Sequence, residues 1–583
     1  MGYFNGGRRG KGSIQVNSGI HWKAVEFQQF EIYDAKSKED KGHRESILQA
    51  AIIHLKAIMS NSRLKLASQF VSQRRDFILA GASMAVLPWI SKLSMGAMAA
   101  TPKFDSDPFT LGVASGEPEP DGMVLWTRLA PHPLEGGGMP VEIYEVAWEI
   151  ATDESMRNVV QRGTELATPQ LGHSVHVEVH GLQPDRWYWY RFTCGEARSA
   201  VGKTRTTPLA HLMPDRLRFA FVSCQSFEQG LFTGYDHMQR EDLDLVVHLG
   251  DYIYEYGGKD KQVRRHTEGE IKTLDDYRNR YAQYRTDPHL QAAHAQFPWL
   301  IVWDDHEVDN NYANDISEEK NVDSATLLLR RANAYQAFYE SMPLRRFSLP
   351  HGPDMQLYRQ VNYGRLANFE MLDTRQYRTD QPSGDGKKPL LEGAFDPKAT
   401  LLGTAQAGWL MSGLLKSTAH WNVLAQQVMM ARVDVKAGEE SLYQMDQWAG
   451  YDVARKKLLS FIADRRVPNP VVLTGDIHSN WVNDLKVDFN NPDDPTVATE
   501  FVGTSISSSG NGIREPKGLS EIYSENPFVR FHNGERGYVS CEVTPASWRS
   551  DYQVVEYVDR PGAPLVTRAS FIVESGHPGA KKV

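Results

Sequence analysis

The chain has 583 residues, of which 41% are hydrophobic and 23% are charged, and its formal net charge is −9. This length is too great for one ordinary core, so we expect at least two domains. The negative charge argues against a nucleic-acid backbone as the main partner. Three cysteines are too few for a disulfide scaffold, and we expect Cys194 and Cys541 to be buried as small hydrophobic residues.

The first hundred residues carry a pattern typical of export. Arg74 and Arg75 precede a mildly apolar run, which is followed by Ala97-Met98-Ala99, an A-x-A cleavage pattern. The pattern resembles a twin-arginine signal, although Gln73 stands where such signals usually carry Ser or Thr. The alternative is a chance arginine pair before a buried helix. The apolar run is too short and too rich in Gly and Ala for a stable membrane span.

Export signals begin near the amino terminus, so Met59 is the expected start of the protein. Residues 1–58 are then an upstream over-translation or an unstructured extension, and residues 59–99 are the signal peptide. The mature protein would begin near Ala100. We expect the twin-arginine export machinery to carry it, already folded, to the periplasm or the cell exterior.

Residues 100–212 show short alternating strands separated by turns, for example at Tyr144–Ile150 and Tyr188–Cys194. This spacing predicts a small all-β sandwich, of the immunoglobulin or fibronectin type. In residues 213–560, apolar strands alternate with helical segments such as Asp323–Ser341 and Gln406–Lys416. We expect an α/β domain with two sheets and helices on both outer faces. Residues 561–583 have no helical period and are interpreted as a tail.

Four apolar segments of the α/β region each end in side chains that can bind metal. Ligands of α/β proteins bind outside the carboxyl ends of strands, so these four strand tips predict one polynuclear metal site. The tips are Ser223-Cys224-Gln225, Gly250-Asp251-Tyr252-Ile253-Tyr254, Asp304-Asp305-His306-Glu307 and Gly475-Asp476-Ile477-His478.

Each tip also has a plainer interpretation. Tyr254 could be an ordinary wall aromatic, and a single Cys at a strand end is more often a buried hydrophobic residue. Asp476 and His478 would project to one side if their strand continues, and otherwise they are capping residues. The acidic block at 304–307 could be a solvated turn. Because all four tips occur in one chain, the metal interpretation is favoured for each of them.

Within the acidic block we expect one of Asp304 and Asp305 to bind metal, with Asp305 preferred. His306 would face the substrate as a phosphate contact or a general acid. The thiolate, the phenolate and three carboxylates would gather about five negative charges in one pocket, which is prohibitive without cations. Thiolate and imidazole suit a transition metal and carboxylates suit calcium, so we favour Fe(III) with one or two Ca²⁺ ions.

The motifs resemble the PhoD-type alkaline phosphatase/phosphodiesterase family, which is distantly similar to purple acid phosphatases. The four tips carry the resemblance, together with Leu372–Arg378 and Asn533–Tyr538, and it spans about Phe109 to Thr544. It implies a metallophosphoesterase domain of two sheets flanked by helices, preceded by a β-sandwich, with an iron–calcium centre. The resemblance also implies that iron is held by Cys224, Asp251, Tyr254, Asp476 and His478. Asp251 would be shared with calcium, and Asp305 would also bind calcium. Asp476, Asp304 and Asn311 are further candidates for calcium ligands.

The function expected is an exported metal-dependent alkaline phosphatase/phosphodiesterase, in which a metal-bound hydroxide attacks phosphorus in line. His306, Asp305 and Asp251 are the expected catalytic residues. We expect His306, Asn311 and Arg375 to contact the substrate, although helix-to-sheet salt bridges explain Arg375 equally well. The loop Ser505–Ser509 could offer hydroxyls to a phosphate, or be a plain flexible loop.

Two other functions fit the sequence less well. A phospholipase D-like enzyme would use the same metals with an aromatic rim, for which Tyr252, Tyr256 and Trp448 are the candidates. A non-catalytic surface-binding protein would use the β-sandwich for recognition, but the metal-ligand set is complete, which argues against a degenerate site.

Overall fold

The computed structural model describes residues 102–583. The predicted twin-arginine signal and the start at Met59 lie outside the described residues. Among those described, no helix combines the length and the apolar character that a membrane crossing requires.

A small antiparallel sheet is formed by residues of the predicted β-sandwich. Its central strand β6 alternates half-buried with buried residues and points Tyr190, Phe192 and Cys194 into a core. Cys194 and Cys541 are both free and buried, as predicted. The order of the small sheet is β4 (Val159–Ala167), β3 (Tyr144–Ala151), β6 (Trp187–Cys194) and β7 (Ala197–Arg198), with β8 (Gly202–Arg205) also paired to β6.

The first large sheet begins in the same part of the chain and extends to the carboxyl terminus. Its strand β1 pairs with β2 and also, in parallel, with β11, where Ser115 is opposite Pro298. The amino-terminal strands are therefore continuous with the sheet that carries three of the four tips. The strands in order are β5 (Ser174–Val179), β2 (Gly122–Arg128), β1 (Val113–Glu119), β11 (Pro298–Ile301), β10 (Leu245–His248), β9 (Leu217–Val222), β21 (Val529–Val543), β22 (Ser547–Val555), β23 (Leu565–Glu574) and β24 (His577–Lys582).

The second large sheet shares strand β21 with the first. The first residues of β21 pair with β18, and residues from Arg536 onward pair with β22 and then β9. Gly537, at φ 153°, lies at this change of partner. The second sheet has the order β12 (Arg359–Tyr363), β13 (Ala367–Met371), β15 (Trp421–Ala425), β17 (Pro470–Thr474), β19 (Thr496–Val502), β18 (Asn480–Lys486) and β21. Of the remaining short strands, β20 (Gly512–Ile513) pairs with β21, while β14 (Lys387–Lys388) and β16 (Tyr443–Gln444) pair only with each other among the described strands.

The largest core lies between the two sheets. Phe219 and Trp548 of the first sheet have ring centroids 5.5 Å apart, and Phe219 meets Phe369 of the second sheet at 5.3 Å. Trp421 of the second sheet lies 5.8 Å from Trp548. These aromatic side chains are almost wholly buried, and burial of such large apolar surfaces holds the sheets together.

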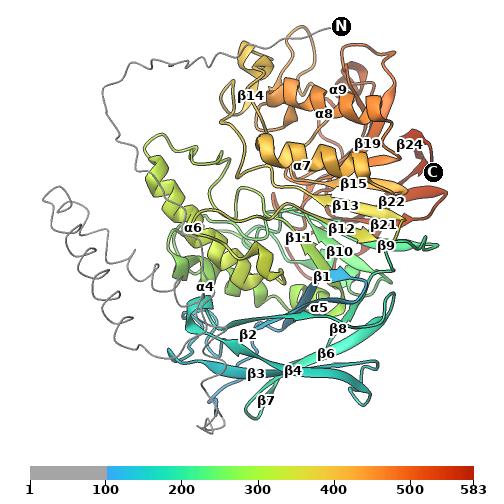
Figure 1. Ribbon diagram of the computed structural model, residues 1–583. Helices are drawn as coiled ribbons and strands as arrows, with labels where there is room; N and C mark the ends of the chain where they lie inside the picture. Colours follow the sequence, from blue (N-terminus) through green and yellow to red (C-terminus); the bar gives the residue numbers. More distant parts are fainter. Residues whose placement is uncertain (1–101) are drawn as a thin grey trace, which may run out of the picture. The chain divides into compact units, whose positions relative to one another are not determined.

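Helices cover the large sheets (Figure 1). Leu410 of α7 and Leu459 of α8 belong to a core shared with the second sheet, and α5 contacts β1 and β11 of the first. Asp323 caps α6 by accepting from Thr326 N. The helices are α3 (Thr233–Met238), α4 (Leu274–Arg285), α5 (Pro288–Gln296), α6 (Ser324–Ser341), α7 (Gly403–Lys416), α8 (Asp452–Arg465) and α9 (Leu519–Glu525), with single 3₁₀ turns at Pro169–Leu171, Arg346–Ser348, Glu392–Phe395 and Trp448–Tyr451.

The expected mixed α/β fold with multi-strand sheets is found, and one part of the expectation is corrected. The segment interpreted as a tail, residues 561–583, contains β23 and β24, which form a hairpin on the first sheet. Its Gly and Pro residues suggested a loose end. Gly576, at φ 78°, instead makes the turn that lets Leu565–Glu574 fold back on β24.

Candidate metal centre and active site

The four predicted strand tips meet at one place between the sheets. Cys224, Asp251 and the acidic block follow β9, β10 and β11, which are adjacent and parallel. Asp476 follows β17 of the second sheet. A side chain at Gly475 would place its Cβ 2.6 Å from Ser223 Oγ, so the absence of one allows the tips of the two sheets to approach.

Cys224, Asp251 and His478 form a first group of ligands. One ligand atom from each lies within 4.8 Å of the other two. The Tyr254 hydroxyl joins them, because it lies 2.9 Å from Asp251 Oδ2 and 3.1 Å from His478 Nε2. The structure thus brings together four of the predicted iron ligands.

A second group consists of acidic residues. Asp304, Asp305 and Asp476 offer oxygens within 4.8 Å of one another, and Asp251, Asp305 and His306 form a further set at the same spacing. Asp476 therefore lies with the acidic block, and its predicted role as an iron ligand stays a prediction. Asp251 belongs to the first group and also to the set with Asp305 and His306, so it connects the two groups.

Four of these residues have left-handed backbone conformations that non-glycine residues seldom adopt. The φ angles are 56° at Cys224, 56° at Asp251, 65° at Asp476 and 54° at His478. Each such conformation costs about 1–3 kcal/mol, and residues that adopt one cluster at functional sites in proteins. The strand before Asp476 ends at Thr474, so the turn and not a continuing strand aims Asp476 and His478.

The carboxylates of the site are buried and incompletely paired. Asp251 Oδ1 and Asp304 Oδ2 have no hydrogen-bond partner among the described residues, and Asp305 Oδ1 has only an ion pair with Arg375. Burial raises the pKa of Asp251, Asp304 and the Cys224 thiol well above their usual values. Burial also opposes ionisation of Asp305, but Arg375 and His306 outweigh it and lower its pKa to about 2. Such oxygens, beside a thiol and a phenol, fit metal cations, which would neutralise them.

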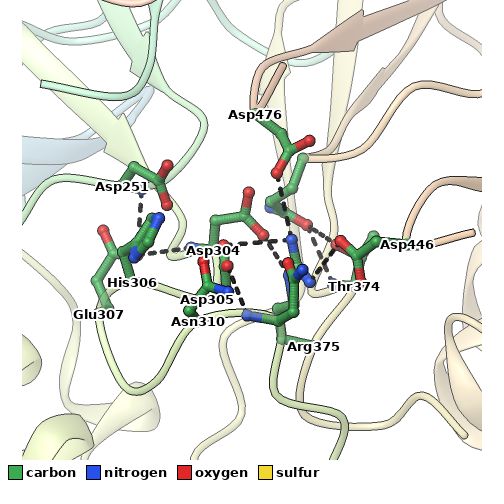
Figure 2. A network of polar contacts seen from close by, with 12 residues as sticks. Asp251, Asp304, Asp305, His306, Glu307, Asn310, Thr374, Arg375, Asp446 and Asp476 are labelled. Carbon is green, nitrogen blue, oxygen red and sulfur yellow. Dashed lines mark hydrogen bonds and ion pairs between the residues drawn. The ribbon is translucent and has the colours of Figure 1, made fainter. Parts of the chain in front are cut away.

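Arg375 supplies fixed positive charge at this site. Its Nε donates to Asp304 Oδ1 at 2.5 Å and its Nη1 to Asp446 Oδ2 at 2.8 Å, while Nη2 lies 3.2 Å from Asp305 Oδ1 (Figure 2). The guanidinium is fully buried. Its ion pairs join a strand tip and a loop and involve no helix, and the predicted substrate contact of Arg375 stays a prediction. Asp446 was missed by sequence reasoning, because it follows no apolar strand.

His306 is held by Glu255. Its Nδ1 lies 2.8 Å from Glu255 Oε2, and Glu255 Oε1 accepts from Asn310 N at 3.0 Å. Burial alone would lower the pKa of His306, but the carboxylates of Glu255, Asp251 and Asp305 raise it well above its usual value. A protonated imidazole held in this way can donate a proton or contact a phosphoryl oxygen.

Glu307 and Asn311 organise the neighbouring turns. The Glu307 carboxylate accepts from the backbone N–H groups of Asp251 and Asp304, at 3.1 and 2.8 Å, and also from Tyr252 N. It thereby ties the β10 tip to the β11 tip. The Asn311 backbone donates to Asp305 Oδ2 at 2.8 Å, and its half-buried side chain donates to Asp385 Oδ2 at 2.8 Å. Glu307 lies within the acidic block that the sequence singled out, but its positioning role was missed.

Comparisons with known proteins identify the family. A family model described as PhoD-like phosphatase matches residues 219–552, and one described as PhoD-like phosphatase, N-terminal domain, matches residues 95–208. Alkaline phosphatase D of Bacillus subtilis (strain 168) is 53% identical over 489 residues, which cover 83% of this chain and 84% of that protein. The chain belongs to the PhoD-like phosphatase family.

A solved structure of a PhoD-like phosphatase agrees with this assignment. The structure titled "Structure of PhoD" matches with a TM-score of 0.81 and 53% identity, covering 83% of this chain and 93% of that chain. The predictions of a PhoD-type family member and of a phosphoric ester hydrolase are thus confirmed.

The aromatic residues considered for a membrane-touching rim are mostly unavailable in this PhoD-like chain. Tyr252 and Trp448 are each only 1% exposed, and Tyr256 is half-buried beside His306. These three residues form no exposed aromatic rim, so the structure gives no support to the phospholipase alternative.

Proposed function

We propose that the chain is an exported, metal-dependent alkaline phosphatase/phosphodiesterase that hydrolyses phosphate esters in the periplasm or outside the cell. The observation that carries the proposal is the meeting of four strand tips, which places the Cys224–Asp251–Tyr254–His478 group beside the acidic group. The 53% identity to alkaline phosphatase D supports the same reaction class.

The proposed cofactors are Fe(III) and one or two Ca²⁺ ions. Cys224, Tyr254 and His478 offer sulfur, phenolic oxygen and nitrogen, which suit a transition metal, with Asp251 as a shared ligand. Asp304, Asp305 and Asp476 offer only carboxylate oxygens, which suit calcium. Asn311 is a further candidate, since its backbone N–H already bonds to Asp305.

The chain's own residues contribute binding and proton transfer in the proposed mechanism. When bound, the metal ions supply charge for the phosphoryl oxygens and lower the pKa of the water that attacks phosphorus in line. His306, held at Nδ1 by Glu255, is proposed to protonate or stabilise the leaving oxygen. Asp251 and Asp305 are proposed to hold the metal ions, and Glu307 fixes the two turns that carry these aspartates.

The export signal and the division of the chain into domains are part of the same proposal. We propose a twin-arginine signal at residues 59–99, an immunoglobulin- or fibronectin-like sandwich at 100–212 and a two-sheet metallophosphoesterase domain that begins at residue 213 and includes the hairpin of β23 and β24. The separate family matches to residues 95–208 and 219–552 support this division.

The test is hydrolysis of a chromogenic phosphate monoester and the matching diester, with calcium present and after chelation. Loss of turnover on chelation and recovery with added calcium are expected, and the ratio of the two rates assigns the substrate class. Asp251→Asn should abolish turnover, while Asp488→Asn, whose carboxylate accepts from Asn490 N in a surface turn and belongs to no ligand group, should not. Absence of turnover from metal-loaded protein would contradict the proposal, and activity on lipid headgroups alone would favour the phospholipase alternative.

A further inference from the structure

The serine loop, Ser505–Ser509, lies against the first ligand group. It follows β19, and Ser505 forms an isolated parallel bridge with Ser223 at the β9 tip. Ser505, Ser507 and Ser508 are fully buried, whereas Ser509 is exposed and has a φ of 69°. The loop is thus held in place by the strand tips, and three of its hydroxyls are closed to a substrate.

Ser508 connects two of the tips through its hydroxyl. Ser508 Oγ lies 2.7 Å from Tyr254 Oη and 2.7 Å from Cys224 O, and it accepts from Ser226 N at 3.0 Å. A hydroxyl has one proton to donate and can accept from two groups. Ser508 therefore fixes the position of the Tyr254 oxygen relative to the backbone from Cys224 to Ser226.

Ser509 sets the orientation of His478. Its Oγ lies 2.9 Å from His478 Nδ1, and His478 Nε2 faces Tyr254 Oη at 3.1 Å. A neutral imidazole can offer a lone pair at Nε2 only if its proton is on Nδ1, and that proton needs an acceptor. Ser509 Oγ is the acceptor that the structure places there.

Arg536 anchors the loop to the β17 tip. Its Nη1 donates to His478 O at 2.7 Å and to Ser508 O at 2.9 Å, and it also bonds to Ser505 Oγ. One buried guanidinium therefore holds both the His478 turn and the serine loop. The Ser509 backbone is fixed separately, because its N–H donates to Gln229 Oε1 at 2.6 Å.

We infer that the serine loop is a positioning element for metal ligands, with Ser508 placing the Tyr254 oxygen and Ser509 holding His478 with Nε2 free to ligate. The inference rests on the proposed metal-dependent function. Partners of this kind orient ligands and set their basicity, and their loss typically weakens metal binding about 10–100-fold. The loop does not serve as a phosphate contact in this assignment.

The test compares Ser508→Ala and Ser509→Ala with Ser507→Ala in the full-length holoenzyme. Ser507 is the matched control, because it is buried in the same loop but its hydroxyl donates to Ser226 O, at 2.8 Å, and to no predicted ligand. Each protein is dialysed against EDTA of increasing concentration, and the retained metal is measured by atomic emission. The visible absorption of any iron–phenolate contact is recorded in parallel. S508A and S509A should release metal at about 10–100-fold lower EDTA, with a shifted absorption band in S508A.

A rescue variant separates ligand positioning from general damage to the loop. Ser509→Asn should recover most of the metal retention, because Asn tolerates positive φ and its side-chain oxygen can accept from His478 Nδ1–H. Retention and absorption in S508A and S509A equal to those of S507A, in an active wild-type enzyme, would overturn this inference alone. A wild-type protein that binds no metal would overturn the proposed function and the inference with it.

Discussion

At the residue scale, His306 is fixed at one ring nitrogen by Glu255, which leaves the other for the substrate. If it protonates the leaving oxygen, His306→Ala should reduce kcat about 10²–10³-fold for alkyl phosphates, which leave poorly. The loss should be far smaller for nitrophenyl phosphate, whose leaving group needs no proton. Steady-state rates across a series of leaving groups check this, and a uniform loss would assign His306 to phosphate binding only.

Arg375 gives a second prediction at the residue scale. Arg375→Ala would leave Asp304 and Asp446 buried without their partner, so the free energy of unfolding should fall by about 3–5 kcal/mol. Arg549, whose pair with Asp551 is partly exposed, is the control, and Arg549→Ala should cost less than about 1 kcal/mol. Denaturant unfolding measures both. An R375A protein as stable as R549A, with a raised KM, would instead indicate a substrate contact.

At the element scale, strand β21 passes from the second large sheet to the first near Gly537. A Cβ at this position would overlap the carbonyl oxygen of Gln553 in β22. Gly537→Ala should therefore lower the free energy of unfolding by about 3 kcal/mol, since overpacking forces the paired strands apart. Gly562→Ala is the control, because Gly562 has a φ of 87° but open space around it, so only backbone strain of about 1–2 kcal/mol is expected. Equal losses in thermal unfolding would show that steric overlap is unimportant.

The elements that could be predicted from the sequence are those with a local signal. The tips after β9, β10, β11 and β17 were found because apolar runs stop at ligand-type residues. The pairing of β1 with β11 could not be predicted, because strand partners nearly two hundred residues apart leave no local pattern in the sequence. The same holds for Asp446, which meets Arg375 from 71 positions away, and for the left-handed backbone of Asp476.

At the scale of the whole molecule, stability should depend on pH through Glu370. This side chain is fully buried in β13 with one bond, from Asn368 Nδ2 at 2.8 Å, and burial raises its pKa to about 7. The folded protein then binds more protons than the unfolded chain between about pH 4.5 and 7, so this residue's contribution falls as pH rises through that window. The loss approaches roughly 3 kcal/mol above pH 7.

The measurement is denaturant unfolding of Glu370→Gln and wild type at pH 5 and pH 8. The variant should be more stable than wild type at pH 8, by up to about 3 kcal/mol, and nearly equal to it at pH 5. Glu439→Gln, on an exposed loop, should match wild type at both values. A constant difference between E370Q and wild type across pH would refute the titration of Glu370 in this range.

The pairing of β1 with β11 has a consequence for dissecting the protein. A fragment that starts at residue 219, where the phosphatase family model begins, would lack β1 and leave the backbone of β11 as an open edge. An uncovered edge of apolar residues recruits other chains. Trp299 and Leu300, five and four residues before Asp304, would then lie in this uncovered edge strand. We therefore expect this fragment to aggregate when it is expressed alone. In the whole protein, β1 covers the edge of β11 and so opposes self-association.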